Sequence, residues 1–186
     1  MEKKFILTDK FVINSFGIKL FQIKCTRSFK YAQEGDLGGY IEKEDNLSQE
    51  GNAWVYDNAW VSGDAWVSDN AWVSDNARVS GNARVSSNAW VSGNARVFGN
   101  AWVSGDADIE NDNEHCGFDG FGSCNRHTHA YMTKEKKVEI ICGCFRGSIE
   151  EFEKKVEETH SGTVYEKQYK SIINVIKIKF GLTDFT

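Results

Sequence analysis

Several features that would mark other classes of protein are missing from this chain of 186 residues. It has no apolar stretch of about 18 residues, the minimum for a helix that spans a membrane. The basic start at Lys3 and Lys4 is followed by only three apolar residues, Phe5–Leu7, which is too short for a secretory signal. We therefore expect a cytoplasmic protein that does not enter a membrane.

A basic track for nucleic acid is also missing. The formal net charge is −5, and the segment from Gly51 to Glu110 has three arginines, no lysine and seven acidic residues. Affinity for DNA and RNA comes mainly from cations that contact phosphates. A long nucleic acid is therefore not an expected partner.

The five cysteines form no recognisable metal motif. A pair of CxxC knuckles is absent, and Cys142 and Cys144, two positions apart on an expected strand, offer only two thiols on one face. In a reducing compartment a disulfide framework is not expected either. We expect neither a metal site nor a cofactor.

What the chain does contain is a six-residue phrase that occurs ten times without a gap between Gly51 and Glu110. A repeat this short cannot bury a core alone and must stack on copies of itself as a solenoid. Each copy has alanine and, two positions later, valine, as in Ala53 and Val55, or isoleucine in the last copy, so both point inward from a strand. The Ser, Gly, Asp and Asn that follow tolerate the backbone of a tight corner. Each hexad is predicted to form one strand and one corner.

The register of the hexads is typical of left-handed parallel β-helices, in which three hexads make one triangular coil. Residues eighteen apart should then lie above one another, and the six tryptophans should all lie on the outside. The expected outer rows are Trp54, Trp72 and Trp90; Trp60, Arg78 and Arg96; and Trp66, Arg84 and Trp102. Two degenerate hexads, with Ile41 and Leu47 in the alanine position, extend the β-helix to residues 39–110, which gives about four coils.

The flanking segments carry different patterns. Residues 1–38 are expected to form a β cap, because the apolar alternation through Lys4–Lys24 predicts a hairpin. Residues 111–125, rich in Asn, Asp and Gly, predict a linker or an irregular last coil. Residues 126–186 predict an α+β module. It has a strand at Lys137–Phe145, a helix that Ser148 and Glu151 cap and that runs to about His160, and a second helix at Glu166–Phe180.

These motifs together resemble a family of phage and prophage proteins. The resemblance rests on Leu37–Glu42, the Asn-Ala-Trp/Arg-Val repeats, and Gly143–Gly147 followed by Glu151-Phe152 and Thr159-His160. It implies a mostly β fold that joins a left-handed parallel β-helix to a compact C-terminal module. It also implies residence in the cytoplasm of an infected or lysogenic bacterial host.

An enzyme is not the expected function. Many hexapeptide β-helices are acyltransferases, which need a general base, usually a histidine on a coil. The four histidines of this chain, His115, His127, His129 and His160, all follow the repeats. An acyltransferase is therefore the last of our functional hypotheses, and no catalytic residue is assigned.

The six tryptophans, Trp54, Trp60, Trp66, Trp72, Trp90 and Trp102, allow three interpretations. They can pack against another copy of the chain, be covered by the chain's own tail, or remain exposed and stack on rings of a ligand. A homo-oligomer is favoured, and a trimer first, because several aligned indoles would make an unusually large exposed apolar patch.

The C-terminal module carries the candidate ligand site. Arg146 comes directly before the helix that begins at Ser148, which suits an anion, although a solvated arginine is an equally simple explanation. The residues expected to bind a ligand are Arg126, His129, Arg146, Ser148, Thr159, His160 and Tyr169, with Ser123 close to them.

Two functional hypotheses remain open. The first is a noncatalytic, oligomeric phage protein that sequesters a small nucleotide-derived signal of bacterial antiviral defence, with arginine for phosphate and aromatic rings for the base. The alternative is a structural or assembly protein, a rigid spacer in the virion or the host whose tail acts as a trimerising cap.

Overall fold

The computed structural model describes residues 2–183 and divides the chain into two compact units, with the boundary between Asp112 and Asn113. The N-terminal unit begins with β1 (Phe5–Ile13), β2 (Lys19–Cys25), β3 (Leu37–Ile41) and the short 3-10 helix η1 (Glu44–Asn46). Its remaining strands are β4 (Trp54–Val55), β5 (Trp60–Val61), β6 (Trp66–Val67), β7 (Trp72–Val73), β8 (Arg78–Val79), β9 (Arg84–Val85), β10 (Trp90–Val91), β11 (Arg96–Val97), β12 (Trp102–Val103) and β13 (Asp108–Ile109).

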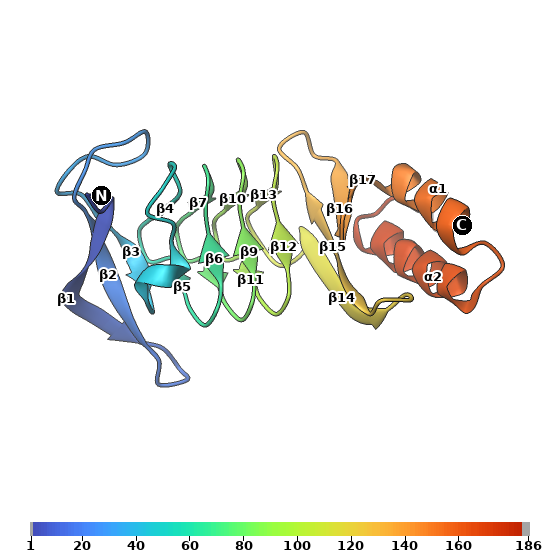
Figure 1. The fold of residues 1–186 in the computed structure, drawn as a ribbon, viewed down its shortest axis with the longest axis horizontal. Coiled ribbons are helices and arrows are strands. Elements are labelled where there is room, and N and C mark those ends of the chain that lie inside the picture. Colours follow the sequence, from blue (N-terminus) through green and yellow to red (C-terminus); the bar gives the residue numbers. More distant parts are fainter. Residues whose placement is uncertain (1, 184–186) are drawn as a thin grey trace. The chain divides into compact units, whose positions relative to one another are not determined.

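The repeats form a three-sided β-solenoid of about four coils (Figure 1). Its three parallel sheets follow the orders β3-β5-β8-β11, β4-β7-β10-β13 and β6-β9-β12. Each hexad stacks on the third hexad after it, eighteen residues further along the chain, for example Trp54 on Trp72 and Arg78 on Arg96. The alanines and valines of the hexads are buried, so the expected prism is confirmed. The left-handed sense of winding stays a prediction from the hexapeptide register.

The corners have the conformation that their residues predict. Positive φ recurs once in every hexad, at glycine or at Asp57, Asp69, Asp75 and Ser87. The asparagine that follows bonds to its counterpart one coil away, as the Asn52 Nδ2 does to the Asn70 Oδ1 at 2.8 Å. These side-chain ladders satisfy polar groups at the corners without any ligand.

The first coil differs from the expected hexad register. Ile41 pairs with Val61 and Leu47 with Val67, so both lie in the valine position rather than the alanine position. Both side chains are buried as expected. Twenty residues separate each pair instead of eighteen, because the corner before Val55 is longer than the others. The degenerate sequence between Leu47 and Ala53 contains no repeat from which this longer corner could be deduced.

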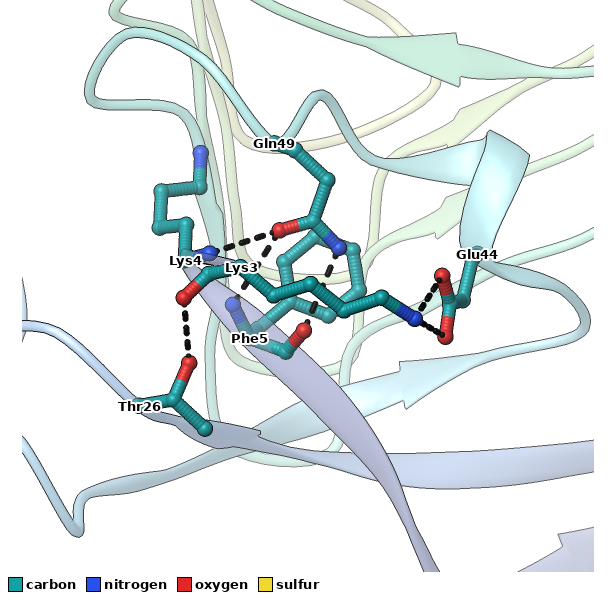
Figure 2. Close-up of polar contacts among 6 residues, drawn as sticks. All are labelled: Lys3, Lys4, Phe5, Thr26, Glu44 and Gln49. Carbon is teal, nitrogen blue, oxygen red and sulfur yellow. Dashed lines mark hydrogen bonds and ion pairs between the residues drawn. The ribbon is translucent and has the colours of Figure 1, made fainter. Parts of the chain in front are cut away.

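The longer corner is where the N-terminal strand docks (Figure 2). The Gln49 side chain accepts hydrogen bonds from the backbone N–H groups of Lys4 and Phe5 and donates one to the Phe5 carbonyl. The buried Lys4 ammonium donates to the carbonyls of Glu50 and Ala53, at 3.3 and 2.9 Å. The predicted hairpin is confirmed, since β1 pairs antiparallel with β2, and β2 then pairs with β3 at the edge of the first coil.

Burial of Lys4 predicts a rise in stability at alkaline pH. Desolvation, with the nearby charge of Arg27 second, lowers the pKa of Lys4 from 10.5 to about 8. Between these values the unfolded chain keeps the proton that the folded chain has lost, so stability increases with pH, whereas below pH 8 the full cost remains. We expect roughly 3 kcal/mol over this window, absent in Lys4→Met. Urea unfolding of both proteins measures it, and parallel pH profiles would contradict it.

The tryptophan rows are covered unequally. Trp54 is completely buried, with its ring 5.4 Å from that of Phe29 and 6.3 Å from that of Phe5. Trp72 stacks on Tyr56 at 4.1 Å. Trp66 is half exposed, as are Trp90 and Trp102. The chain's own N-terminal segment covers Trp54, which none of the three expected arrangements included. Packing of the exposed tryptophans against another copy of the chain stays a prediction.

The C-terminal unit is an antiparallel sheet with two helices on one face (Figure 1). The strand order is β14 (His115–Phe121), β15 (Arg126–Met132), β16 (Val138–Cys142) and β17 (Phe145–Ser148), followed by α1 (Ile149–His160) and α2 (Val164–Lys179). The core joins Ile140 of the sheet to Phe152 and Ile173 of the helices. Within residues 2–183, neither helix is long and apolar enough to cross a membrane.

Two expectations for this part of the chain are corrected. Residues 111–125 contain β14 rather than only a linker or an irregular coil. This strand pairs with β15, and its Phe118 side chain packs against the core of the unit. The segment 137–145 is not one strand, since a turn with Gly143 at a φ of +61° separates β16 from β17. Both helices and the Ser148–Glu151 capping box are confirmed.

Candidate ligand cavity in the C-terminal unit

A cavity of about 290 Å³ lies between the helices and one end of the sheet in the C-terminal unit. Its lining comes from the loop after β14, from β15, from the turn between β16 and β17, and from both helices. The lining residues are Ser123, Cys124, Arg126, Cys142, Cys144, Phe145, Phe152, Lys155, Val156, Thr159, His160 and Tyr169. The volume is at the lower end of the range for small-molecule sites.

Arg126 enters the cavity from the first residue of β15. Its side chain crosses the turn at Gly143 so closely that a Cβ there would lie 2.5 Å from the Arg126 Nη1. Glycine suits this position for two reasons: it readily adopts a positive φ, and it leaves room for the guanidinium. Among residues 2–183 the guanidinium makes no hydrogen bond or ion pair. Its N–H donors are therefore available to water or to a ligand in the cavity.

Tyr169 and His160 supply the aromatic part of the lining. The His160 ring stacks on the Tyr169 ring, with centroids 5.4 Å apart and planes 28° apart. A Cβ at Gly122 would overlap the Tyr169 hydroxyl, so this glycine lets the phenol pack against the backbone. Burial, and next the Cys142 thiol, raise the pKa of Tyr169 to about 12. The phenol is therefore a neutral hydrogen-bond donor at neutral pH.

The charged residues of the lining, Arg126 and Lys155, are both basic. Lys155 comes from α1, is exposed, and has its ammonium 3.6 Å from the Glu158 carboxylate. The cavity thus has cationic but no anionic side chains among its described lining residues, while Phe145 and Phe152 supply apolar area on the side of the helices. This combination suits a small anion that also carries a flat ring.

Three thiols line the same cavity. Cys142 is buried and lies 3.3 Å from the Thr128 hydroxyl and 3.8 Å from the Tyr169 hydroxyl. Cys124 and Cys144 are exposed. These two thiols are open to reagents and report on whatever fills the cavity.

The structure brings together four of the seven residues expected to bind a ligand. Arg126, Thr159, His160 and Tyr169 line the cavity, as does Ser123. Whether any of them binds a ligand stays a prediction.

Arg146 and Ser148 lie outside the cavity because other groups engage them. The Arg146 guanidinium forms a two-point ion pair with Glu139, at 2.7 and 3.2 Å. The Ser148 hydroxyl accepts from the Glu151 N–H, and the Glu151 carboxylate accepts from the Ser148 N–H. The capping box thus occupies the helix N-terminus that was expected to hold an anion.

His129 also lies elsewhere. It pairs with Ile141 across the sheet and shares its face, whereas Cys142 shares the face that the helices cover. The His129 Nε2 is 3.1 Å from the His115 Nδ1, and the His129 side chain is buried. Among the residues that the structure describes, no group of three His, Cys, Asp or Glu side chains is arranged to hold a metal ion.

Sequence reasoning missed Lys155, Phe145, Phe152 and the exposed thiols as parts of this cavity. Lys155 looks like an ordinary solvated lysine on a helix. The Cys-Gly-Cys-Phe order was a usable signal, because it predicts a tight turn whose flanking side chains share a face.

Comparison with known proteins supports the fold of the repeats. Residues 71–87, 77–93 and 89–105 each match the YdcK beta solenoid repeat. A comparison with curated proteins found no match. The central coils are thus similar to the YdcK beta-solenoid repeat family, and the C-terminal unit that holds the cavity lies outside the matched residues.

Proposed function

We propose that the protein binds a small anionic, ring-bearing ligand in the cavity of the C-terminal unit and retains it without chemical change. One observation carries this proposal: the cavity holds Arg126, which has no partner among residues 2–183, together with the stacked rings of His160 and Tyr169. A cation for a phosphate and a ring stack for a base are the groups that nucleotide binding uses.

The size of the cavity favours one nucleotide unit over two, because about 290 Å³ is small for a ligand site. The resemblance to phage proteins favours a signal nucleotide of bacterial antiviral defence as the ligand. Retention of such a signal would lower its free concentration in the host cytoplasm. In this role the solenoid is the scaffold and the cavity is the functional part.

A thermal-shift experiment tests the proposal. The full chain is incubated with cyclic mononucleotides and, separately, with cyclic dinucleotides, and the Tm is followed against ligand concentration. A ligand held only by the folded state stabilises it by about 2.7 kcal/mol at one hundred times its Kd. Arg126→Met is expected to weaken binding roughly 10- to 100-fold, since one charge-assisted contact is lost.

Arg84→Met is the matched control, because Arg84 is an exposed arginine of the solenoid outside the cavity. It should leave the Tm shift unchanged. Chromatography of the nucleotide after incubation tests retention, which predicts that the nucleotide is recovered intact; recovery of a product would assign an enzyme instead. No Tm shift with any nucleotide, together with the protein in purified virions, would favour the structural alternative.

A further inference from the structure

Two exposed thiols line the cavity of the C-terminal unit, those of Cys124 and Cys144. Cys124 lies in the turn between β14 and β15, and Cys144 lies in the turn between β16 and β17. Because the four strands run antiparallel in chain order, both turns are at the same end of the sheet. The proposed retention of a nucleotide uses neither sulfur, so the chemistry of this pair is unassigned.

The Arg126 side chain lies close to both turns. Arg126 follows Cys124 by two residues, and its guanidinium extends over Gly143, the residue before Cys144. A Cβ on Gly143 would lie 2.5 Å from the Arg126 Nη1. Within the described part of the chain this guanidinium has no ion pair that would offset its charge. A cation in this place attracts an anionic reagent toward either thiol.

The other charges around the thiols favour an anionic reagent as well. Lys155 supplies a second cation to the lining, and no acidic side chain lines the cavity among the described residues. The Glu158 carboxylate, 3.6 Å from the Lys155 ammonium, offsets part of the lysine charge. Arg126 is therefore expected to contribute more than Lys155 to any preference for a negatively charged reagent.

We propose that Cys124 and Cys144 form a site of reversible S-thiolation by an anionic low-molecular-weight disulfide of the glutathione class. One thiolate of the pair attacks a sulfur of the disulfide, so that a new S–S bond joins the cysteine to one half while the original S–S bond breaks. The cysteine is oxidised. The other half is reduced, leaves as a thiolate and takes up the proton that the cysteine lost. An excess of reduced thiol reverses the exchange.

The cavity limits the modification to one group per chain. Its volume of about 290 Å³ is at the lower end of the range for small-molecule sites. A glutathionyl group on either thiol would fill the space between the two turns. Its carboxylates would also neutralise the charge of Arg126 and would no longer allow a second anionic disulfide to be attracted. One adduct, distributed between Cys124 and Cys144, is the expected product.

The consequence of the adduct for ligand retention rests on the proposed function. A group that fills the cavity and engages Arg126 should abolish the Tm shift that a nucleotide causes. Formation of the adduct requires no nucleotide, so the two proposals fail separately. A chain that binds no nucleotide can still be thiolated, and a chain that resists thiolation can still show the nucleotide Tm shift.

Peptide mass spectrometry of the full chain tests the site. Reduced Arg84→Cys protein is treated with glutathione disulfide or with cystamine, a cationic disulfide, and the reaction rate of each thiol is followed. The introduced thiol is the reference, because position 84 is exposed on the solenoid. Relative to this reference, Cys124 and Cys144 are expected to prefer glutathione disulfide over cystamine about tenfold or more.

Two further variants test the source of the preference. Arg126→Met should remove most of it, whereas Lys155→Met should reduce it less, and circular dichroism establishes that both variants fold. In the wild-type chain, the cavity thiols should carry one glutathionyl group that dithiothreitol removes. A preference no greater than that of the reference thiol would overturn the proposal. So would adducts on both cavity thiols of the same chain, or a preference that persists in Arg126→Met.

Discussion

Replacing Trp54 with alanine is expected to lower the free energy of unfolding of the N-terminal unit by about 3–5 kcal/mol, the usual cost of removing a large aromatic side chain from a core. Trp54 is completely buried, although it occupies the outward position of its hexad. Phe5 and Phe29 cover it with edge-on ring contacts. Loss of the indole leaves a cavity between the first coils and the N-terminal segment.

Trp66→Ala is the matched control. Trp66 has the same position in its hexad but is 50 % exposed, so its loss is expected to cost less than about 1 kcal/mol. Trp54→Phe should cost less than Trp54→Ala, because a ring remains and the Trp54 Nε1 has no hydrogen bond with residues 2–183 to lose. Urea unfolding of the three variants measures the differences. Equal losses at Trp54 and Trp66 would show that the N-terminal segment does not cover the row.

The solenoid could be predicted from the sequence because each hexad contacts copies of itself. The inward positions of Ala53 and Val55 follow from strand alternation, and the corner at Asp57 follows from the residues that tolerate positive φ. Such a pattern leaves few alternatives. The same argument fails before Ala53, where the sequence no longer repeats and the corner is longer.

The cover on Trp54 could not be predicted, because it depends on contacts between distant segments. Phe29 lies outside any strand and reaches Trp54 across 25 positions of the chain. The sequence around the turn at Lys30 and Tyr31 has no periodic pattern from which such a contact could be predicted. Only the three-dimensional path of the N-terminal segment places it over the first coils.

The candidate cavity could be predicted in part. Tyr169 and His160 come together because two helices with recognisable caps pack side by side. Arg146 was expected at the ligand site, but strand alternation places it on the face opposite Phe145. There it forms an ion pair with Glu139. The face on which a residue of a short strand lies depends on the register of that strand. The length of the turn before β17 sets this register, and it could not be deduced from the sequence.

Deleting one whole coil, residues 81–98, is expected to preserve the fold, whereas deleting residues 81–99 is expected to destabilise it strongly. Removal of eighteen residues brings Arg78 into the place of Arg96, where it can form the same ion pair with Asp112. Removal of nineteen residues leaves a corner one residue short. The strand after the deletion can then pair only if that corner is strained or if the valine of the strand points outward.

The two deletion variants should differ by at least about 3 kcal/mol in the free energy of unfolding, since a shifted register exposes valines that the shorter coil stack would otherwise bury. Urea unfolding followed by circular dichroism measures this difference. Equal stability of the two variants would contradict a solenoid of three hexads to a coil.

The most direct measurement of ligand binding follows alkylation of the thiols by mass spectrometry. Cys124 and Cys144 are exposed at the cavity, while the buried Cys25 serves as an internal control. At one hundred times its Kd, a nucleotide is expected to slow alkylation of Cys124 and Cys144 roughly tenfold or more and to leave Cys25 unchanged. A nucleotide that raises the Tm but leaves both cavity rates unaltered would show that the ligand binds elsewhere, which would contradict the assignment of this cavity.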